Sequence, residues 1–176
     1  MSWTAPITCA TGDLWTAAQH NTYLRDNTAW LHDQPACRGY NSVDATLISP
    51  GATVLAFDSE RFDTDGMHST VTNTSRLLCA TAGIYQITAN LAILGTTPDQ
   101  VNVYIRLNGT TYIAGQQVSV TNSGTNGFSL TALYLLAVGH YVEVVVVNAS
   151  ANVSYVKVAA NYSLEFTAAR VSGVAA

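Results

Sequence analysis

Short β-patterned segments separated by turn residues fill the chain from residue 45 onward, and they constrain the fold more than any other feature. Val, Ile, Tyr and Thr are frequent in these segments, whereas Gly, Asn, Asp and Pro interrupt them. The pattern predicts strands at 54–57, 76–80, 83–94, 101–107, 111–120, 128–136, 141–148, 153–158 and 162–171. Such a succession indicates an all-β jelly-roll β-sandwich of roughly eight to ten antiparallel strands.

Alternation and turn chemistry support this interpretation. Apolar and polar residues alternate along 101–107 and 141–148, which predicts strands with one face in a core. The pair Asn108-Gly109 predicts a tight hairpin between two strands, because both residues tolerate positive φ. Glu143 and Lys157 each interrupt a Val-rich strand, so each lies either on a solvated outer face or in a buried ion pair.

One short α-helix is predicted before the β region, at residues 16–31. Thr16 and Gln19 form a capping-box pattern, and Trp15 stands where a hydrophobic staple would lie. A single short helix is marginal in water, so this one must pack against something. Its apolar and aromatic side chains fall on two adjacent stripes: His20, Leu24 and Leu31, and Tyr23 and Trp30.

Charge is scarce and unevenly distributed. Seven basic and eleven acidic residues give a net charge of −4, and no basic stripe exists, so nucleic acid is not an expected partner. The apolar runs are too short for a membrane-spanning helix, so no membrane insertion is expected. Residues 79–176 carry only six of the eighteen charges, so their surface is either covered by Ser, Thr and Asn or buried against copies of the chain.

The change in composition near residue 45 suggests two parts. Residues 1–44 would be an N-terminal segment that holds the helix and, at 33–41, a linker containing Pro35 and Gly39. Residues 45–176 would be the jelly-roll domain. Cys9, Cys37 and Cys79 show no metal-binding spacing, so we expect three unpaired thiols in a reducing compartment. A disulfide between Cys9 and Cys37 is the alternative.

Asp63, Asp65 and His68 raise the hypothesis of a metal site, with calcium as the candidate, because Asp-x-Asp-Gly begins like a calcium loop. The acidic residue that would close such a loop is missing. The alternative is an exposed turn in which Asp side chains accept hydrogen bonds from backbone amides. No other cofactor is expected.

Enzymatic activity is not expected. Gly-x-Ser-x-Gly, phosphate-binding glycine loops and His-x-x-x-His are all missing from the sequence. The four histidines are scattered over helix, linker and loops, and few carboxylates are available for acid–base pairs.

Four stretches of the β region resemble the C1q/TNF-like jelly roll: FDTDGMH from residue 62, CATAGIY from 79, RLNG from 106 and LAVGHYV from 136. His140 stands where that family usually has Asp. The resemblance covers residues 45–171 and implies a homotrimer packed through apolar and aromatic faces. The candidates for its interface or for the core are Tyr85, Tyr104, Tyr134, Tyr141 and Phe166. Several tyrosines could instead stack on sugar rings.

The N-terminal region resembles the opening of tailed-phage structural proteins. The shared pattern is Thr-Ala-x-x-x-Asn-Thr-x-x-Arg-Asp-Asn, which starts at Thr16. This resemblance implies a virion protein assembled in the host cytoplasm, and no secretory signal is visible at the start. The residues expected to anchor it to other virion proteins are Trp3, Trp15, Tyr23, Leu24, Trp30 and Leu31.

Together the two resemblances imply a non-enzymatic virion protein whose jelly roll faces outward as a tail adhesin. Its host receptor would be a surface glycan, bound by the loops from Gly95 to Gln100, Ser119 to Gly127 and Asn148 to Asn152. The alternatives are a capsid decoration protein and a soluble C1q-like recognition module. We expect deletion of residues 1–40 to leave a folded trimer that is no longer incorporated into particles.

Overall fold

The computed structural model describes residues 4–48, 50–95, 99–120, 124–149, 154–160 and 162–173. The chain divides into two compact units, Met1–Gln34 and Pro35–Ala176. No helix in the described ranges is both long and apolar enough to cross a lipid bilayer.

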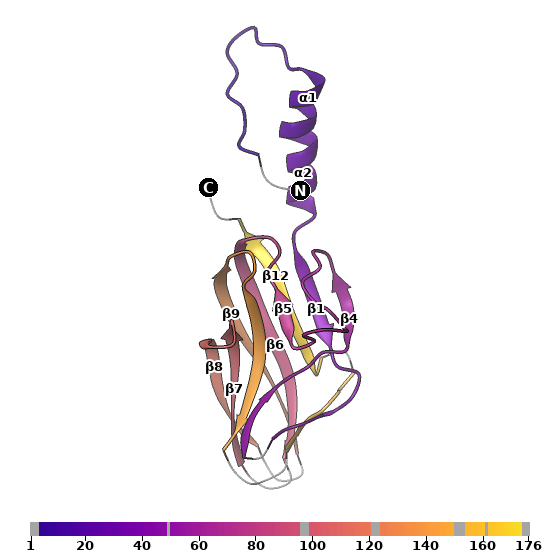
Figure 1. The fold of residues 1–176 in the computed structure, drawn as a ribbon, viewed down its shortest axis with the longest axis vertical. Coiled ribbons are helices and arrows are strands. Elements are labelled where there is room, and N and C mark those ends of the chain that lie inside the picture. Colours follow the sequence, from indigo (N-terminus) through magenta and orange to yellow (C-terminus); the bar gives the residue numbers. More distant parts are fainter. Residues whose placement is uncertain are drawn as a thin grey trace. The chain divides into compact units, whose positions relative to one another are not determined.

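The second unit is a jelly-roll β-sandwich whose described strands all pair antiparallel (Figure 1). Its large sheet contains β1 (Ala36–Tyr40), β2 (Ala45–Thr46), β4 (Ser59–Asp63), β6 (Gly83–Gly95), β9 (Thr125–Leu136), β11 (Ser154–Val156) and β12 (Glu165–Ser172). The order is β2-β11-β6-β12-β1-β4, and β9 pairs with the other edge of β6.

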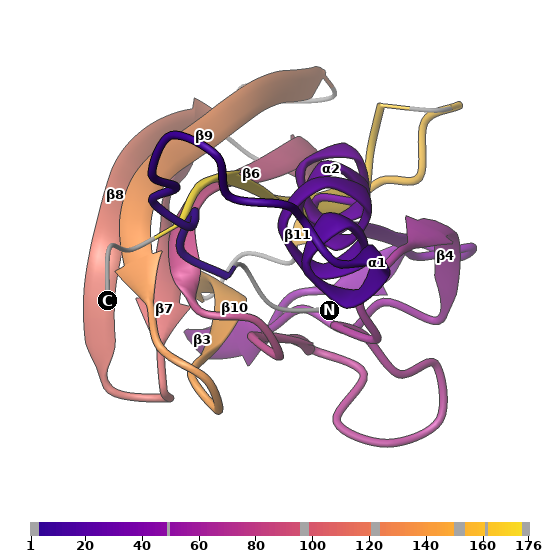
Figure 2. The ribbon, with the colours of Figure 1, turned by 90° about the horizontal axis from the view of Figure 1, so that it is seen from above.

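The small sheet follows the order β3-β10-β7-β8, and β5 also pairs with β10. Its strands are β3 (Gly51–Val54), β5 (Arg76–Leu78), β7 (Asp99–Leu107), β8 (Thr111–Val120) and β10 (Tyr141–Asn148). Figure 2 shows β8 and β9 at the same side of the sandwich, where one edge of each sheet meets the other.

The inner faces of the two sheets enclose one core, and the alternation in the sequence accounts for it. Along β7, Val101, Val103 and Ile105 are fully buried, and the residues between them face outward. The ring of Phe57 stacks on that of Phe166 with centroids 5.5 Å apart, which joins the loop before β4 to β12. The predicted all-β jelly-roll sandwich and the single preceding helix are confirmed.

Most predicted strands appear with nearly the expected bounds, but one is displaced. The prediction of a strand at 54–57 is wrong beyond Val54, where β3 ends. Leu55 and Phe57 are buried as expected, yet their amides bond to Val144 and Thr74 rather than to a continuous neighbouring strand.

The interpretation of 33–41 as a linker is wrong for residues 36–40, which form strand β1. This strand lies between β12 and β4, with Cys37 and Gly39 facing the core. Gly39 stands at a bulge, and a Cβ there would lie 3.4 Å from the Cβ of Phe57. The glycine therefore serves close packing inside a strand. The boundary between the two compact units falls in the sequence between Gln34 and Pro35, ten residues before the boundary expected at residue 45.

The predicted hairpin at Asn108-Gly109 is confirmed. Both residues have positive φ, 48° and 72°, and the amide of Thr110 donates to the carbonyl of Leu107. This geometry matches the right-handed twist of the two strands it joins, β7 and β8.

Replacing Gly109 with Ala is expected to lower the free energy of unfolding by about 1 kcal/mol. The turn requires a φ of 72° at this position, which is unfavourable for a residue with a Cβ, and the new Cβ would lie 2.9 Å from the Tyr141 hydroxyl. Chemical denaturation followed by circular dichroism measures the change. Thr110→Ala, at the exposed neighbouring position, is the control and should change stability by less than about 0.5 kcal/mol. Equal stability of both variants would contradict the role assigned to Gly109.

The first unit is a short helix and an irregular arm. Helical backbone runs through α1 (Ala17–His20), a π-helical stretch η1 (Asn21–Asp26) and α2 (Asn27–His32). The predicted capping box is present, because the Gln19 amide donates to the Thr16 hydroxyl and the Thr16 amide to the Gln19 side chain. The buried Asn27 ties the arm to the helix through two hydrogen bonds with the backbone of Thr4.

Candidate functional site

Two carboxylates, each held by two arginines, lie on the outer faces of the sheets. On the small sheet, Glu143 accepts from Arg76 Nε at 3.1 Å and from Arg106 Nη2 at 2.9 Å. Its side chain is only 5% exposed, so the interpretation of Glu143 as a solvated residue is wrong. The arginines come from β5 and β7, on either side of β10, and cover the carboxylate.

The large sheet carries the second cluster. Glu165 on β12 is fully buried and pairs with Arg38 of β1 and, at 3.1 Å, with Arg61 of β4. The Arg61 guanidinium also lies over the ring of Tyr40, 4.0 Å from its centroid. Lys157, by contrast, pairs at the surface with Asp44, and this hydrogen bond together with one from the Val158 amide lowers the pKa of Asp44. The outer-face interpretation therefore holds for Lys157.

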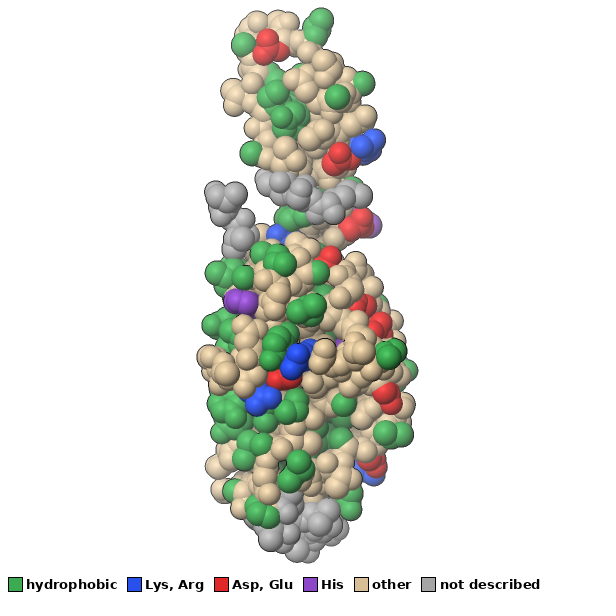
Figure 3. All heavy atoms as spheres, viewed as in Figure 1, with side chains coloured by type: hydrophobic (Ala, Val, Ile, Leu, Met, Phe, Trp, Pro, Cys, Tyr) green, Lys and Arg blue, Asp and Glu red, His purple; other side chains and the backbone are tan. Residues whose placement is uncertain are grey.

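On the outer face of the large sheet, the last residues of β9 are apolar although they are exposed. Leu133 and Leu135 of β9 are 66% and 54% exposed, and Leu135 lies opposite Ile84 of β6. Farther along the same face the side chains are small, with Thr131 opposite Thr88 and their hydroxyls 3.1 Å apart. Figure 3 views this unit from the opposite side, that of the small sheet, where green and tan atoms also cover most of the visible surface and red and blue ones are few.

The apolar face of β9 was not predicted, although the sequence contains a signal for it. In residues 132–136, ALYLL, apolar residues occupy both parities of the strand, which is typical of a strand covered on both faces.

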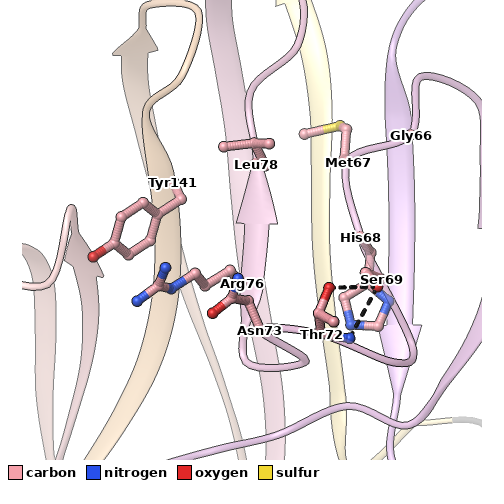
Figure 4. Close-up of a pocket in the computed structure, with 9 residues that line it drawn as sticks. All are labelled: Gly66, Met67, His68, Ser69, Thr72, Asn73, Arg76, Leu78 and Tyr141. Carbon is pink, nitrogen blue, oxygen red and sulfur yellow. Dashed lines mark hydrogen bonds between the residues drawn. The ribbon is translucent and has the colours of Figure 1, made fainter.

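A pocket of about 180 Å³, the Arg76 pocket, lies on the other side of the molecule between the loop 66–73, β5 and β10 (Figure 4). Met67, Leu78 and the Tyr141 ring supply its apolar walls. The Arg76 guanidinium extends from β5 toward that ring and lies 4.1 Å from the ring centroid. The remaining lining residues come from the loop: Gly66, His68, Ser69, Thr72 and Asn73.

The structure does not bring Asp63, Asp65 and His68 together as metal ligands. The two carboxylate oxygens of Asp63 accept from the amides of Asp65 and His68. The ring nitrogens of His68 face Glu60 at 2.9 Å and the Thr74 carbonyl at 3.1 Å. Over the described ranges, no group of three His, Cys, Asp or Glu side chains is arranged to hold a metal ion. The geometry matches the alternative of a capped turn.

The aromatic candidates divide between core and surface. Tyr85 and Phe166 are fully buried, and Tyr134 is a partly buried neighbour of the core. Tyr104 lies on the outer face of the small sheet, stacked on Tyr112 with ring centroids 4.3 Å apart.

Tyr141 lies on the outer face of the small sheet as well, in the wall of the Arg76 pocket. Tyr104 and Tyr141 are therefore remote from the apolar face of the large sheet.

The predicted anchoring residues lie on the N-terminal helix and just before it. Trp15 is 42% exposed and contacts His20 edge to face, which is the expected hydrophobic staple. Leu24 and Leu31 are 46% and 58% exposed, and Tyr23 and Trp30 are half-buried. Trp3 lies outside the described residues. Parts of the proposed ligand loops, 96–98, 121–123 and 150–152, lie outside them too.

All three cysteines are free thiols in the structure. Burial raises the pKa of Cys37 to about 12, with Asp63 and Glu60 adding to the effect, and burial also raises the pKa of Cys79. Cys9 is exposed, and its sulfur accepts a hydrogen bond from the indole of Trp15.

Only Cys9 is expected to react with iodoacetamide in the folded chain at pH 8. The raised pKa keeps the buried thiols protonated at that pH, and the thiolate is the reactive form. Mass spectrometry should find one adduct in the native chain and three after unfolding in urea. Cys9→Ser should leave the folded chain unmodified, and rapid native labelling of all three thiols would contradict the burial of Cys37 and Cys79.

The sheet order and register define a C1q/TNF-like jelly roll. The globular domain of zebrafish complement 1qA superimposes with a TM-score of 0.52, over 80% of this chain and 99% of that domain, at 13% sequence identity. Murine APRIL superimposes with a TM-score of 0.61, over 78% of this chain and 99% of its own, at 9% identity. Identities this low establish the fold alone. No protein-family model and no curated protein sequence matches the chain.

Proposed function

We propose that this chain is a non-enzymatic, homotrimeric phage virion protein whose jelly roll is a surface-exposed head for host attachment. The observation that carries the proposal is the division into two unequal units. The larger unit has its own complete core, whereas the smaller one exposes much of its apolar surface. A head with a small mounting segment has this organisation.

Self-association is assigned to the outer face of the large sheet. Leu133, Leu135 and Ile84 form an apolar patch there, and the small threonines beside it allow close approach of another copy. A homotrimer is also what the C1q/TNF resemblance implies. In this arrangement the small sheet, with the Arg76 pocket, stays outward.

Attachment to the particle is assigned to the N-terminal unit. The helix buries only Asn27 within its own unit, so Trp15, Leu24 and Leu31 remain available for other virion proteins. A helix this short gains its stability from packing, and a partner would supply it.

Electron microscopy of intact particles with a gold-labelled antibody against the chain tests the proposed function. Label at the tail end is the expected result and would support attachment. Label spread over the head would replace the adhesin by a capsid decoration protein. Unlabelled particles would reject the virion role and favour a soluble recognition module.

A further inference from the structure

The Arg–Glu–Arg cluster on the small sheet holds more positive than negative charge. Arg76 and Arg106 both donate to Glu143, and the hydroxyl of Ser75 donates to it as well. One carboxylate therefore neutralises only one of the two guanidinium groups. The remaining positive charge lies on a protein that is acidic overall, with a net charge of −4, so the cluster can take a second anion.

Arg76 is the arginine that can bind this second anion. It uses only Nε for Glu143, and among the described residues its two terminal nitrogens have no hydrogen-bond partner. Its side chain is 38% exposed and lines the pocket, whereas Arg106 is 20% exposed and does not. The terminal edge of a guanidinium is the fork that binds a carboxylate through two parallel hydrogen bonds.

The rest of the pocket favours a sugar over a peptide. Its apolar walls lie beside a polar rim of Ser69, Thr72 and Asn73. The side-chain amide of Asn73 has no intramolecular hydrogen-bond partner in the described part of the chain. A pyranose presents the same combination of C–H faces and hydroxyl groups. Peptide recognition by strand addition would need free backbone groups, but the amides of Leu78 and Arg76 already donate to Met67 and Asn73.

We propose that the Arg76 pocket binds a single acidic sugar residue, a uronic or sialic acid, through its carboxylate. The proposal rests on the recognition function above and names the ligand class and the site. Its volume, about 180 Å³, is below the range of pockets for drug-sized ligands and suits one sugar residue.

Saturation-transfer NMR on the full chain tests the pocket, with methyl β-D-glucuronide and N-acetylneuraminic acid as probes. Methyl β-D-glucoside and acetate serve as the neutral-sugar and bare-carboxylate probes. Both acidic sugars should bind at least about tenfold more tightly than the glucoside or acetate. The reason is that the charge-assisted hydrogen bonds and the ring contacts act together only in an acidic sugar. Equal binding of glucoside and glucuronide would overturn the role of the carboxylate.

Two variants separate the pocket from the charge cluster. Arg76→Gln should weaken glucuronide binding by about tenfold or more, whereas Arg106→Gln, which removes the other partner of Glu143, should change it less than about threefold. Equal losses in both variants would overturn the assignment to the pocket. If Arg76→Gln fails to fold, Asn73→Gly replaces it as the test variant, because glycine tolerates the positive φ of 51° at this position and lacks the side-chain amide. This variant should weaken glucuronide binding severalfold.

The remaining outcomes are also decisive. A short peptide with a free C-terminal carboxylate that binds as tightly as glucuronide would overturn the sugar assignment. Absence of saturable binding by either acidic sugar, with tail-end gold label on particles, would reject the pocket and leave the attachment function. Glucuronide binding without particle label would keep the pocket and reject the virion role.

Discussion

The chain is expected to sediment at micromolar concentration as a trimer of the 18.7 kDa protomer, and the double substitution Leu133→Asp, Leu135→Asp is expected to yield monomers. Because the two leucines are 66% and 54% exposed, burial of each would contribute roughly 1–2 kcal/mol to association. The substitution removes that gain and places six uncompensated carboxylates in one trimer, each costly to bury. The expected loss of affinity is several orders of magnitude.

Analytical ultracentrifugation measures this effect. Val71→Asp is the matched control, because Val71 is 84% exposed in a loop outside both sheets and should leave the trimer intact. A wild-type monomer at micromolar concentration would reject self-association. A trimer that survives the double substitution would move the interface away from the outer face of the large sheet.

Two truncations that differ by six residues are expected to behave in opposite ways. Deletion of residues 1–34 should leave the jelly roll folded, because that unit has its own core. Deletion of residues 1–40 should unfold it, contrary to the expectation from sequence. The longer deletion removes β1, with it the buried Cys37, and takes Arg38 away from the buried Glu165. Glu165 would keep only Arg61, and β12 and β4 would lose the strand that pairs with both of them, so the combined loss should be a large share of typical domain stability.

Thermal unfolding followed by circular dichroism compares the two truncations. The shorter deletion should melt within a few degrees of the full chain. The longer one should already be unfolded at 25 °C and show no cooperative transition on heating. The reverse result, or cooperative melting of both, would show that β1 is dispensable. The shorter deletion should also be missing from particles if the N-terminal unit mounts the protein.

The strands that were predicted well are those whose local pattern is complete. Residues 111–120 and 141–148 become β8 and β10 with the expected bounds, because each alternates between two turns with clear signals. The capping box at Thr16 and the turn at Gly109 are local in the same sense. The missed strand β1 has breakers inside and before it, Gly39 and Pro35, and its partners β12 and β4 are distant in sequence.

The candidate site could not be predicted to the same degree. Glu143 was a charged residue in a valine strand, and nothing near it in sequence indicated that arginines 67 and 37 residues away would bury it. Glu165 depends in the same way on Arg38 and Arg61, more than a hundred residues earlier. The Arg76 pocket needs a loop, β5 and β10 together, and sequence spacing does not reveal that meeting.

Fold class, helix position and turn geometry followed from interactions between residues close in the chain, where propensity, alternation and positive φ act directly. The buried carboxylates, the apolar outer face and the pocket were decided only by tertiary structure. Each depends on which strands become neighbours, and strand pairing brings together side chains that the chain itself keeps far apart.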